Sequence, residues 1–270
     1  MLFNSPENIR RMTPLNPFER FEDGRPKVPD DLLERMALVT NDEAWGVLER
    51  VYGYHFQFEG NWLNLHPERI LVGRAVTAMF VPLRPDLQQV IQDEGTSQGR
   101  RGGQNTWVID TLQKDDVIVV DLFGKIRDGT FAGDNLSTTI LRRTGRGMII
   151  HGGVRDVTRI AELPRLAVFT RGVDPSAIAD VTLVGVNIPI RIGNATVLPG
   201  DVVLGTPEGV TFVPPHLVQE VVERSEAVRL RDVFGKQRLA EGTYTAGQID
   251  VSVWTDEIEA DFVTWRAGRT

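Results

Sequence analysis

Residues 133–156, GDNLSTTILRRTGRGMIIHGGVRD, constrain the fold of this chain more than any other stretch. Two glycine turns bracket one helix-sized segment and one apolar, strand-sized segment, with Asp134 after the first turn and Asp156 after the second. Turns of this kind can converge in space. Two aspartates can hold a divalent cation directly or through its waters, and Arg155 can bind a carboxylate or an enolate through paired hydrogen bonds. The pattern therefore indicates chemistry on a 2-oxo acid.

The two aspartates also have a structural interpretation. Asp134 precedes NLSTTILRR and Asp156 precedes VTRIAEL, and aspartate is a favoured helix N-cap because its carboxylate accepts the unpaired N–H groups of the first turn. Residues 133–137 also predict an anion site, since a glycine turn at a helix start directs several N–H groups outward. Capping and a functional role are compatible, so both interpretations stay open.

Composition narrows the classes of function. A chain of 270 residues can bury a substantial core, as one large domain with elaborated ends or as one domain with a small appendage. The net charge of -7 gives no footprint for DNA or RNA, so no nucleic-acid partner is expected. Without cysteine there is no disulfide or thiolate metal site. Since no apolar run reaches the roughly 18 residues of a membrane helix and the N-terminus lacks a signal-peptide core, we expect a cytoplasmic protein with no membrane partner.

Composition also divides the chain into three zones. Residues 1–29 are rich in proline, asparagine and charge, which predicts an irregular N-terminal arm whose Phe18 and Phe21 contact a neighbouring molecule. Residues 30–214 form the main domain, and residues 215–270 a C-terminal helical extension. Amphipathic helices are expected near DDLLERMALV, EAWGVLERV, HLVQEVVERSEAVRLRDVFGKQRL and TDEIEADFVTW, and the clearest strands at VVDL, GMIIHG, LAVFT, DVVLG and VTFVP. Many short strands predict a β-rich, layered α/β domain rather than a regular βαβ winding.

Further motifs follow one another along about two-thirds of the chain: GRAVTA at 73–78, DDVIVVD at 115–121, GDNLST at 133–138, GGVRD at 152–156, VFTRGVDP at 168–175 and IPIRIGNATVLPGDVVLGTPEGVTFVPP at 188–215. Together they resemble the RraA-like family of 4-hydroxy-4-methyl-2-oxoglutarate aldolases and of the regulator of ribonuclease E activity, formerly described as demethylmenaquinone methyltransferases. A methyltransferase is rejected because no glycine-rich turn follows an N-terminal strand to hold an adenosyl cofactor. The resemblance implies that residues 30–214 are a catalytic domain of the swivelling β/β/α, phosphohistidine-domain-like architecture. It also implies a homotrimer or hexamer with active sites between subunits.

The resemblance assigns roles to individual residues. Asp156 would contact Mg2+ or Mn2+, and Asp134 would hold metal-bound water. Arg155 would bind the pyruvyl oxygens, while the N–H groups of Asn135 and Leu136 would bind the substrate carboxylate.

One position departs from the aldolase members of that family. They carry an acidic residue after two more positions beyond the Arg-Asp pair, where this chain has Arg159. The missing acid belongs to the water shell of the metal. Arg159 therefore leaves the metal affinity, the proton carrier and the identity of the reaction open, without removing the core of the site.

Four further features have two interpretations each. Lys125, in a loop that ends at Asp134, is either a substrate contact or a solvated charge. Asp232 lies on the C-terminal helix, where relatives supply a carboxylate to the adjacent subunit's site; the alternative is an ordinary surface charge. His151 is either a satisfied histidine at a strand end or a proton shuttle. The segment GTSQGRRGGQN at 95–105 predicts a mobile surface loop, which could close over an anionic substrate.

These interpretations together predict a class II aldolase or oxo-acid lyase. With Mg2+ or Mn2+, it would cleave a carbon–carbon bond of a small anionic 2-oxo acid by retro-aldol cleavage or decarboxylation, giving pyruvate or a related product, with oxaloacetate decarboxylation as a side activity. No Schiff-base lysine is required. The alternative is a non-enzymatic regulatory ring that binds and inhibits a ribonuclease or helicase. The exact substrate, the physiological metal and the choice between trimer and hexamer stay open.

Overall fold

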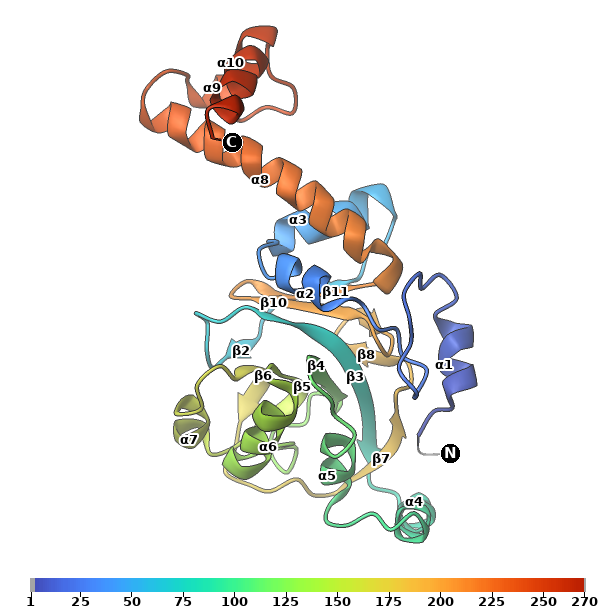
Figure 1. The fold of residues 1–270 in the computed structure, drawn as a ribbon. Helices are drawn as coiled ribbons and strands as arrows, with labels where there is room; N and C mark the ends of the chain where they lie inside the picture. Colours follow the sequence, from blue (N-terminus) through green and yellow to red (C-terminus); the bar gives the residue numbers. More distant parts are fainter. Residues whose placement is uncertain (1–2, 270) are drawn as a thin grey trace. The chain divides into compact units, whose positions relative to one another are not determined.

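The computed structural model describes residues 3–269 of the chain, which has a mixed α/β fold (Figure 1). Contacts within the chain divide it into two compact units, Met1–Val221 and Val222–Thr270. The boundary lies inside the long helix α8 (Val218–Ala240). No helix within residues 3–269 is both long and apolar enough to cross a membrane.

The first unit alternates short helices with short strands. Its helices are α1 (Pro6–Met12), α2 (Asp30–Met36), α3 (Asn41–Trp45), the π-helix η1 (Gly46–Val51), α4 (Pro85–Ser97), α5 (Gln104–Ile109), α6 (Asp134–Thr144), α7 (Val157–Ala161) and the 3-10 turn η2 (Pro215–Leu217). Its strands are β1 (Phe58–Glu59), β2 (Leu63–Asn64), β3 (Leu71–Pro82), β4 (Asp116–Asp121), β5 (Gly147–Val154), β6 (Ala167–Val173), β7 (Val181–Val186), β8 (Ile190–Ile192), β9 (Ala195–Val197), β10 (Val202–Thr206) and β11 (Gly209–Val213).

Nine strands form one mixed sheet within residues 3–269. Their order is β1-β11-β10-β3-β4-β5-β6-β2, and β7 pairs with the second half of β3. Strands β3, β4, β5 and β6 run parallel to one another, whereas the other pairs are antiparallel. The carboxyl ends of the parallel strands therefore meet at one edge of the sheet. The second glycine turn predicted from the sequence is absent, because Gly152 and Gly153 lie inside β5.

The sheet is covered on both faces, which explains the unbroken apolar runs of its central strands. In β4, Ile118 and Val120 pack with the apolar side chains of α5, α6 and α7. Val117 and Val119 point to the opposite face and pack with β8 and β9, which pair as a separate two-stranded sheet. The predicted mixed α/β fold with many short strands is confirmed. The expectation that it would lack a regular βαβ winding is wrong for the centre of the sheet, because helices join the parallel strands β3 to β6 there.

The predicted arm, residues 3–29 of which are described, packs on its own chain. Arg25 is fully buried and donates from Nη1 to Asp116 Oδ1 at 2.7 Å, which ties the arm to the start of β4. The ring of Phe21 lies 5.0 Å from the guanidinium carbon of Arg25 and 5.6 Å from that of Arg74. Phe21 thus contacts its own chain, where the sequence had predicted a neighbouring molecule.

The second unit contains the rest of α8, α9 (Ala246–Ile249) and α10 (Asp256–Ala267). Its small core is aromatic: the ring centroid of Phe234 lies 5.3 Å from that of Trp254 and 5.4 Å from that of Phe262. A salt bridge of 2.6 Å between Arg238 and Asp261 links α8 to α10. The two helices predicted between residues 215 and 270 are therefore present.

Candidate functional site

Backbone hydrogen bonds join the segment before Asp134 to the segment before Asp156. Phe131 N–H donates to the carbonyl of Gly153 at 2.9 Å, and Arg155 N–H donates to the carbonyl of Ala132 at 3.1 Å. The chain approaching Asp134 therefore runs alongside the end of β5 and the residues that follow it. The helix α6 and strand β5 between the two segments carry the chain away from this edge and back to it.

Gly133 makes the approach close. A Cβ atom on this residue would lie 2.2 Å from Asp156 Oδ2 and 3.0 Å from Arg155 Nε, so these side chains would have to move to make room for it. The carboxylate of Asp156 thus lies against the backbone immediately before Asp134. Asp134, Arg155 and Asp156 consequently form one cluster, half-exposed at the carboxyl edge of the sheet.

Neither aspartate caps its helix, so the structural interpretation is wrong for both. The N-cap of α6 is Gly133, and Asp134, in the first turn, accepts the N–H of Asn135 at 2.8 Å. Asp156 occupies the N-cap position of α7, but it makes no capping hydrogen bond. Its backbone is left-handed, with φ 58° and ψ 35°, a conformation that costs most residues about 1–2 kcal/mol and that aspartate tolerates better. Its partner is Arg155, whose Nε lies 3.6 Å from Oδ2.

The start of α6 offers donors for an anion. Asn135 N–H is engaged by Asp134 and becomes available only if that side chain turns away. Leu136 N–H lies in the first turn, where backbone donors have no partner within the helix. The positive end of the helix dipole lies at the same place, so a carboxylate is stabilised there.

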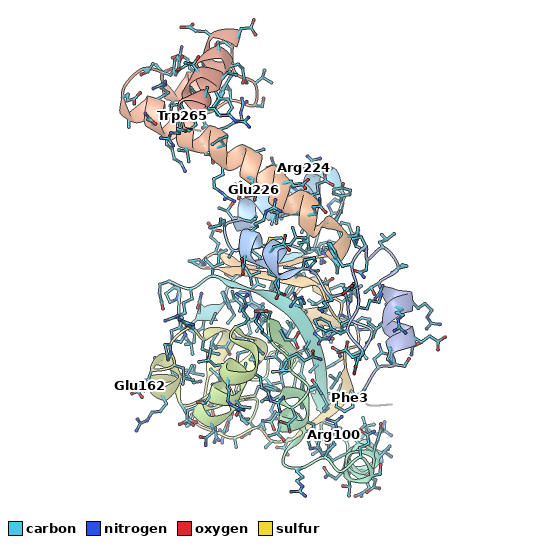
Figure 2. The ribbon with its side chains drawn as sticks, viewed as in Figure 1. Phe3, Arg100, Glu162, Arg224, Glu226 and Trp265 are labelled. Carbon is cyan, nitrogen blue, oxygen red and sulfur yellow. The ribbon has the colours of Figure 1, made fainter. Side chains whose placement is uncertain are left out.

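Three other side chains considered in the sequence analysis have partners outside the cluster of Asp134, Arg155 and Asp156. The ammonium of Lys125 donates to the backbone carbonyl of Ala179 at 2.8 Å. Arg159 lies on the exposed side of α7 and faces Glu162, labelled in Figure 2, across 3.6 Å. His151 lies within β5 rather than at its end; its Nδ1 is 3.4 Å from Oδ1 of Asp121, the last residue of β4, and both side chains are largely buried.

The segment 95–105 is not the free loop that its glycines predicted. Helix α4 continues through Ser97, and the chain is anchored where Trp107 Nε1 donates to the carbonyl of Arg101 at 3.1 Å. The guanidinium of Arg100 stacks on the ring of Phe3 at 4.0 Å from its centroid (Figure 2). Arg100 is thereby held on the arm.

Asp232 is exposed on α8 in the second unit. Its predicted contact is with the site of another subunit. That contact stays a prediction.

The acidic pair fits a strongly hydrated cation. Among residues 3–269, no group of three or more His, Asp or Glu side chains is arranged to hold a metal ion. Mg2+ commonly uses one or two carboxylates and keeps several of its waters, and Mn2+ prefers the same oxygen ligands. Asp156 and Asp134 provide such a pair, and the absence of a Cβ on Gly133 leaves the space that the Asp156 carboxylate needs. The pair does not fit a metal enclosed by protein ligands.

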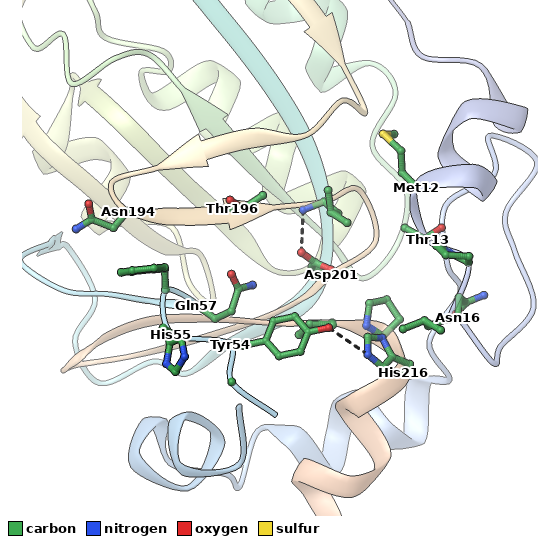
Figure 3. Close-up of a pocket in the computed structure, with 17 residues that line it drawn as sticks. Met12, Thr13, Asn16, Tyr54, His55, Gln57, Asn194, Thr196, Asp201 and His216 are labelled. Carbon is green, nitrogen blue, oxygen red and sulfur yellow. Dashed lines mark hydrogen bonds between the residues drawn. The ribbon is translucent and has the colours of Figure 1, made fainter. Parts of the chain in front are cut away.

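A cavity of about 510 Å³ lies in another part of the first unit (Figure 3). None of the predicted site residues lines it. Sequence reasoning missed it because its walls come from four separate segments, and only two of these, 194–201 and 214–216, overlap one of the quoted motifs. Its one carboxyl group, Asp201, is buried, and burial raises the pKa of that group to about 7.

The Aldolase/RraA family model, described as RraA-like, matches residues 42–212. The chain belongs to the RraA-like family. The resemblance carried by the sequence motifs is thus confirmed, and the match ends within the first unit.

Individual relatives agree with this family. The protein DlpA of Legionella pneumophila is 36% identical over 189 residues, which cover 68% of this chain but only 28% of that protein. A putative 4-hydroxy-4-methyl-2-oxoglutarate aldolase of Halalkalibacterium halodurans is 26% identical over 160 residues, covering 58% of this chain and 74% of the relative. The crystal structure of an unusual member of the RNase ES inhibitor RraA protein family, from Streptomyces coelicolor, superposes with a TM-score of 0.67 at 23% identity, covering 78% of this chain and 100% of the other. This last likeness concerns the fold alone.

Proposed function

We propose that this RraA-like protein is a divalent-metal-dependent carbon–carbon lyase that acts on a small anionic 2-oxo acid. The observation that carries the proposal is the close approach of Asp156 and Arg155 to Gly133, which places an acidic pair, an arginine and a helix N-terminus at one edge of the sheet. The names of relatives as 4-hydroxy-4-methyl-2-oxoglutarate aldolases support it. The swivelling β/β/α architecture, the homotrimer or hexamer with shared sites and the cytoplasmic location belong to the same proposal.

Two groups of the substrate are bound, its carboxylate and its 2-oxo oxygen. Its carboxylate lies at the N-terminus of α6, where Leu136 N–H donates and Asn135 N–H joins once Asp134 releases it. The half-exposed guanidinium of Arg155 then faces the 2-oxo oxygen. A planar guanidinium suits this task because it can donate to two oxygens at once.

Asp156 would hold Mg2+ or Mn2+ directly, and Asp134 would hold it through water. When bound, the cation supplies Lewis-acid polarisation of the 2-oxo group. One difference between the two aspartates supports this division of tasks: before substrate binds, Asp134 Oδ1 accepts a backbone N–H, whereas Asp156 makes no capping hydrogen bond.

The proton and the electrons move as follows in the retro-aldol cleavage. Asp134 accepts the proton of the 4-hydroxyl group through a water molecule. The bond between C3 and C4 breaks, C4 becomes a carbonyl, and the electron pair passes through C3 to the 2-oxo oxygen, where Arg155 stabilises the enolate. The proton that Asp134 took up returns through water to C3, which gives pyruvate and restores the carboxylate. Oxaloacetate reaches the same enolate by losing carbon dioxide, and this needs no base.

The test measures pyruvate released from oxaloacetate and from a panel of 4-hydroxy-2-oxo acids with Mg2+, with Mn2+ and with a chelator. The central variant is Asp156→Asn, because asparagine tolerates the left-handed backbone and removes only the charge. We expect a loss of roughly 100-fold or more, since metal polarisation supplies several kcal/mol. Asp128→Asn is the matched control, because Asp128 is also left-handed, with φ 55°, and pairs only loosely with Arg127 at 3.9 Å. Full metal-dependent activity in Asp156→Asn would place the chemistry elsewhere.

The second candidate is the regulatory ring that inhibits a ribonuclease or helicase. Arg159, in the place of the family acid, favours it, and the structural neighbour from Streptomyces is an unusual member of the RNase ES inhibitor RraA protein family. A folded wild type that releases no pyruvate from any of these substrates with either metal would reject the lyase. Inhibition of a purified ribonuclease that Asp156→Asn leaves unchanged would then support the ring.

A further inference from the structure

Four segments of the first unit enclose the cavity of about 510 Å³ in Figure 3. They are residues 12–16 after α1, residues 53–57 before β1, residues 194–201 around β9, and residues 214–216 after β11. Pockets of this size accommodate small organic molecules. The cavity is therefore large enough to bind such a molecule, and it is separate from the cluster of Asp134 and Asp156.

Its walls are mainly apolar and aromatic. Met12, Leu198, Pro214 and Pro215 line it, together with the rings of Tyr54 and Phe56. Leu15 and Phe56 also remain 63% and 66% exposed at the rim of the cavity lining. An apolar ligand body would cover them.

A tight turn places one carboxyl group in these walls. In Leu198-Pro199-Gly200-Asp201, the N–H of Asp201 donates to the carbonyl of Leu198 at 3.1 Å, and Gly200 supplies the positive φ of 89°. The N–H of Leu198 donates in return to Asp201 Oδ2 at 2.8 Å (Figure 3). Oδ1 has no hydrogen-bond partner among residues 3–269, although Asp201 is only 2% exposed.

The carboxyl group also has no counter-ion among the described residues that line the cavity. Among the described lining residues none is Lys or Arg. Burial lowers the pKa of His216, which keeps its imidazole neutral, and its Nε2 lies 3.4 Å from the hydroxyl of Tyr54. His55 is paired with Glu49 at 2.9 Å. The raised pKa of Asp201 is the consequence of this isolation.

We propose that this cavity binds a small organic amine, whose ammonium group pairs with Asp201 Oδ1 and whose apolar body packs against Phe56 and Leu198. An ammonium supplies both the missing hydrogen-bond donor and the missing charge. The ring of Tyr54 adds attraction for a cation. A neutral ligand would leave the charge unpaired, and an anion would be repelled.

The probe is 2-phenylethylamine, compared with 2-phenylethanol and 3-phenylpropionate in calorimetric titrations at about pH 8. We expect the amine to bind at least roughly tenfold more tightly than the alcohol, the typical gain of a charge-assisted hydrogen bond, and the carboxylate not to bind. Equal affinity of amine and alcohol would overturn the proposal. So would the absence of any binding by 2-phenylethylamine, butylamine and tryptamine at millimolar concentration.

Two variants separate recognition from folding. Asp201→Asn keeps an oxygen for Leu198 N–H, so the turn is preserved, and it should reduce the amine's affinity at least roughly tenfold while sparing that of the alcohol. Thr196→Trp, at an exposed lining position of β9, should fill the cavity and abolish both. Asp93→Asn, an exposed site on α4, is the control and should change neither. Undiminished amine binding in Asp201→Asn would show that the carboxyl group serves only the turn.

Discussion

Asp201→Asn should also change how stability depends on pH. The folded-state pKa of Asp201 is about 7, raised by burial from the ordinary value of 3.8. The neutral carboxyl group therefore favours the folded state. This contribution is fully present below pH 3.8 and is lost as the pH rises through 7. Asparagine cannot ionise, so the stability of Asp201→Asn should not fall with rising pH for this reason.

The size of the effect follows from proton linkage. Between about pH 5 and pH 8, the wild type should lose roughly 2–3 kcal/mol of unfolding free energy relative to Asp201→Asn, because the unfolded chain ionises this group throughout that interval and the folded chain only near its end. The hydrogen bond from Leu198 N–H at 2.8 Å is available to both side chains. Other titrating groups, such as His216, affect wild type and variant alike and cancel in the difference.

Urea denaturation of both proteins at the two pH values measures this difference. The unfolding slopes should agree, so that the midpoints report stability alone. Asp201→Ala serves as a control, because it removes the turn hydrogen bond and should cost about 1 kcal/mol relative to Asp201→Asn at either pH. If the gap between wild type and Asp201→Asn is the same at both pH values, Asp201 is ionised in the folded protein and the burial argument is wrong.

Three further changes test other parts of the molecule. Arg25→Met should lower the free energy of unfolding by about 3–5 kcal/mol, measured in urea, because it leaves the buried Asp116 without its counter-ion and with only the N–H of Gln113 as donor; a loss below about 1 kcal/mol would mean that water reaches the pair. Arg155→Lys should leave the circular-dichroism spectrum unchanged and slow oxo-acid cleavage roughly 10–100-fold, because an ammonium cannot donate to two oxygens in one plane; wild-type kinetics would remove Arg155 from the site. Arg159→Glu should tighten Mg2+ or raise cleavage if the family acid belongs to the water shell, and should lower activity if Arg159 binds substrate. Unchanged metal affinity and kinetics would place Arg159 outside the site.

The central elements could be predicted because local pattern and burial agree there. The run DVIVVD is β4, with every residue buried, since the sheet is covered on both faces. Helix α6 ends where Gly145 adopts φ 69°, as a glycine turn indicates. By contrast, Gly95 suggested a loop but lies inside α4, where a Cβ would meet the Trp107 ring at 2.3 Å. That contact joins separate helices, and no local pattern encodes it.

The two candidate sites also differ in how far the sequence predicts them. Asp134 and Asp156 are joined by one helix and one strand, and a helix followed by a parallel strand returns the chain to the edge it left, so their spacing was informative. The capping interpretation failed because it depends on backbone angles, and the left-handed conformation of Asp156 is not written in its spacing. The cavity at Asp201 needs residues from 12 to 216 to meet. Only the folded chain assembles them.

The geometry at Gly133 also limits where the chemistry of this chain can diverge from that of its relatives. Asp156 has little freedom, since its left-handed backbone suits few side chains and its carboxylate lies where any larger residue at 133 would place a Cβ. Arg159 has much more freedom, because it is exposed on the short helix α7 and its contact at 3.6 Å is with Glu162, which is also exposed. A change of substrate or of proton carrier therefore meets less structural resistance at Arg159 than at Asp156. The departure from the aldolase pattern lies at the less constrained of the two positions.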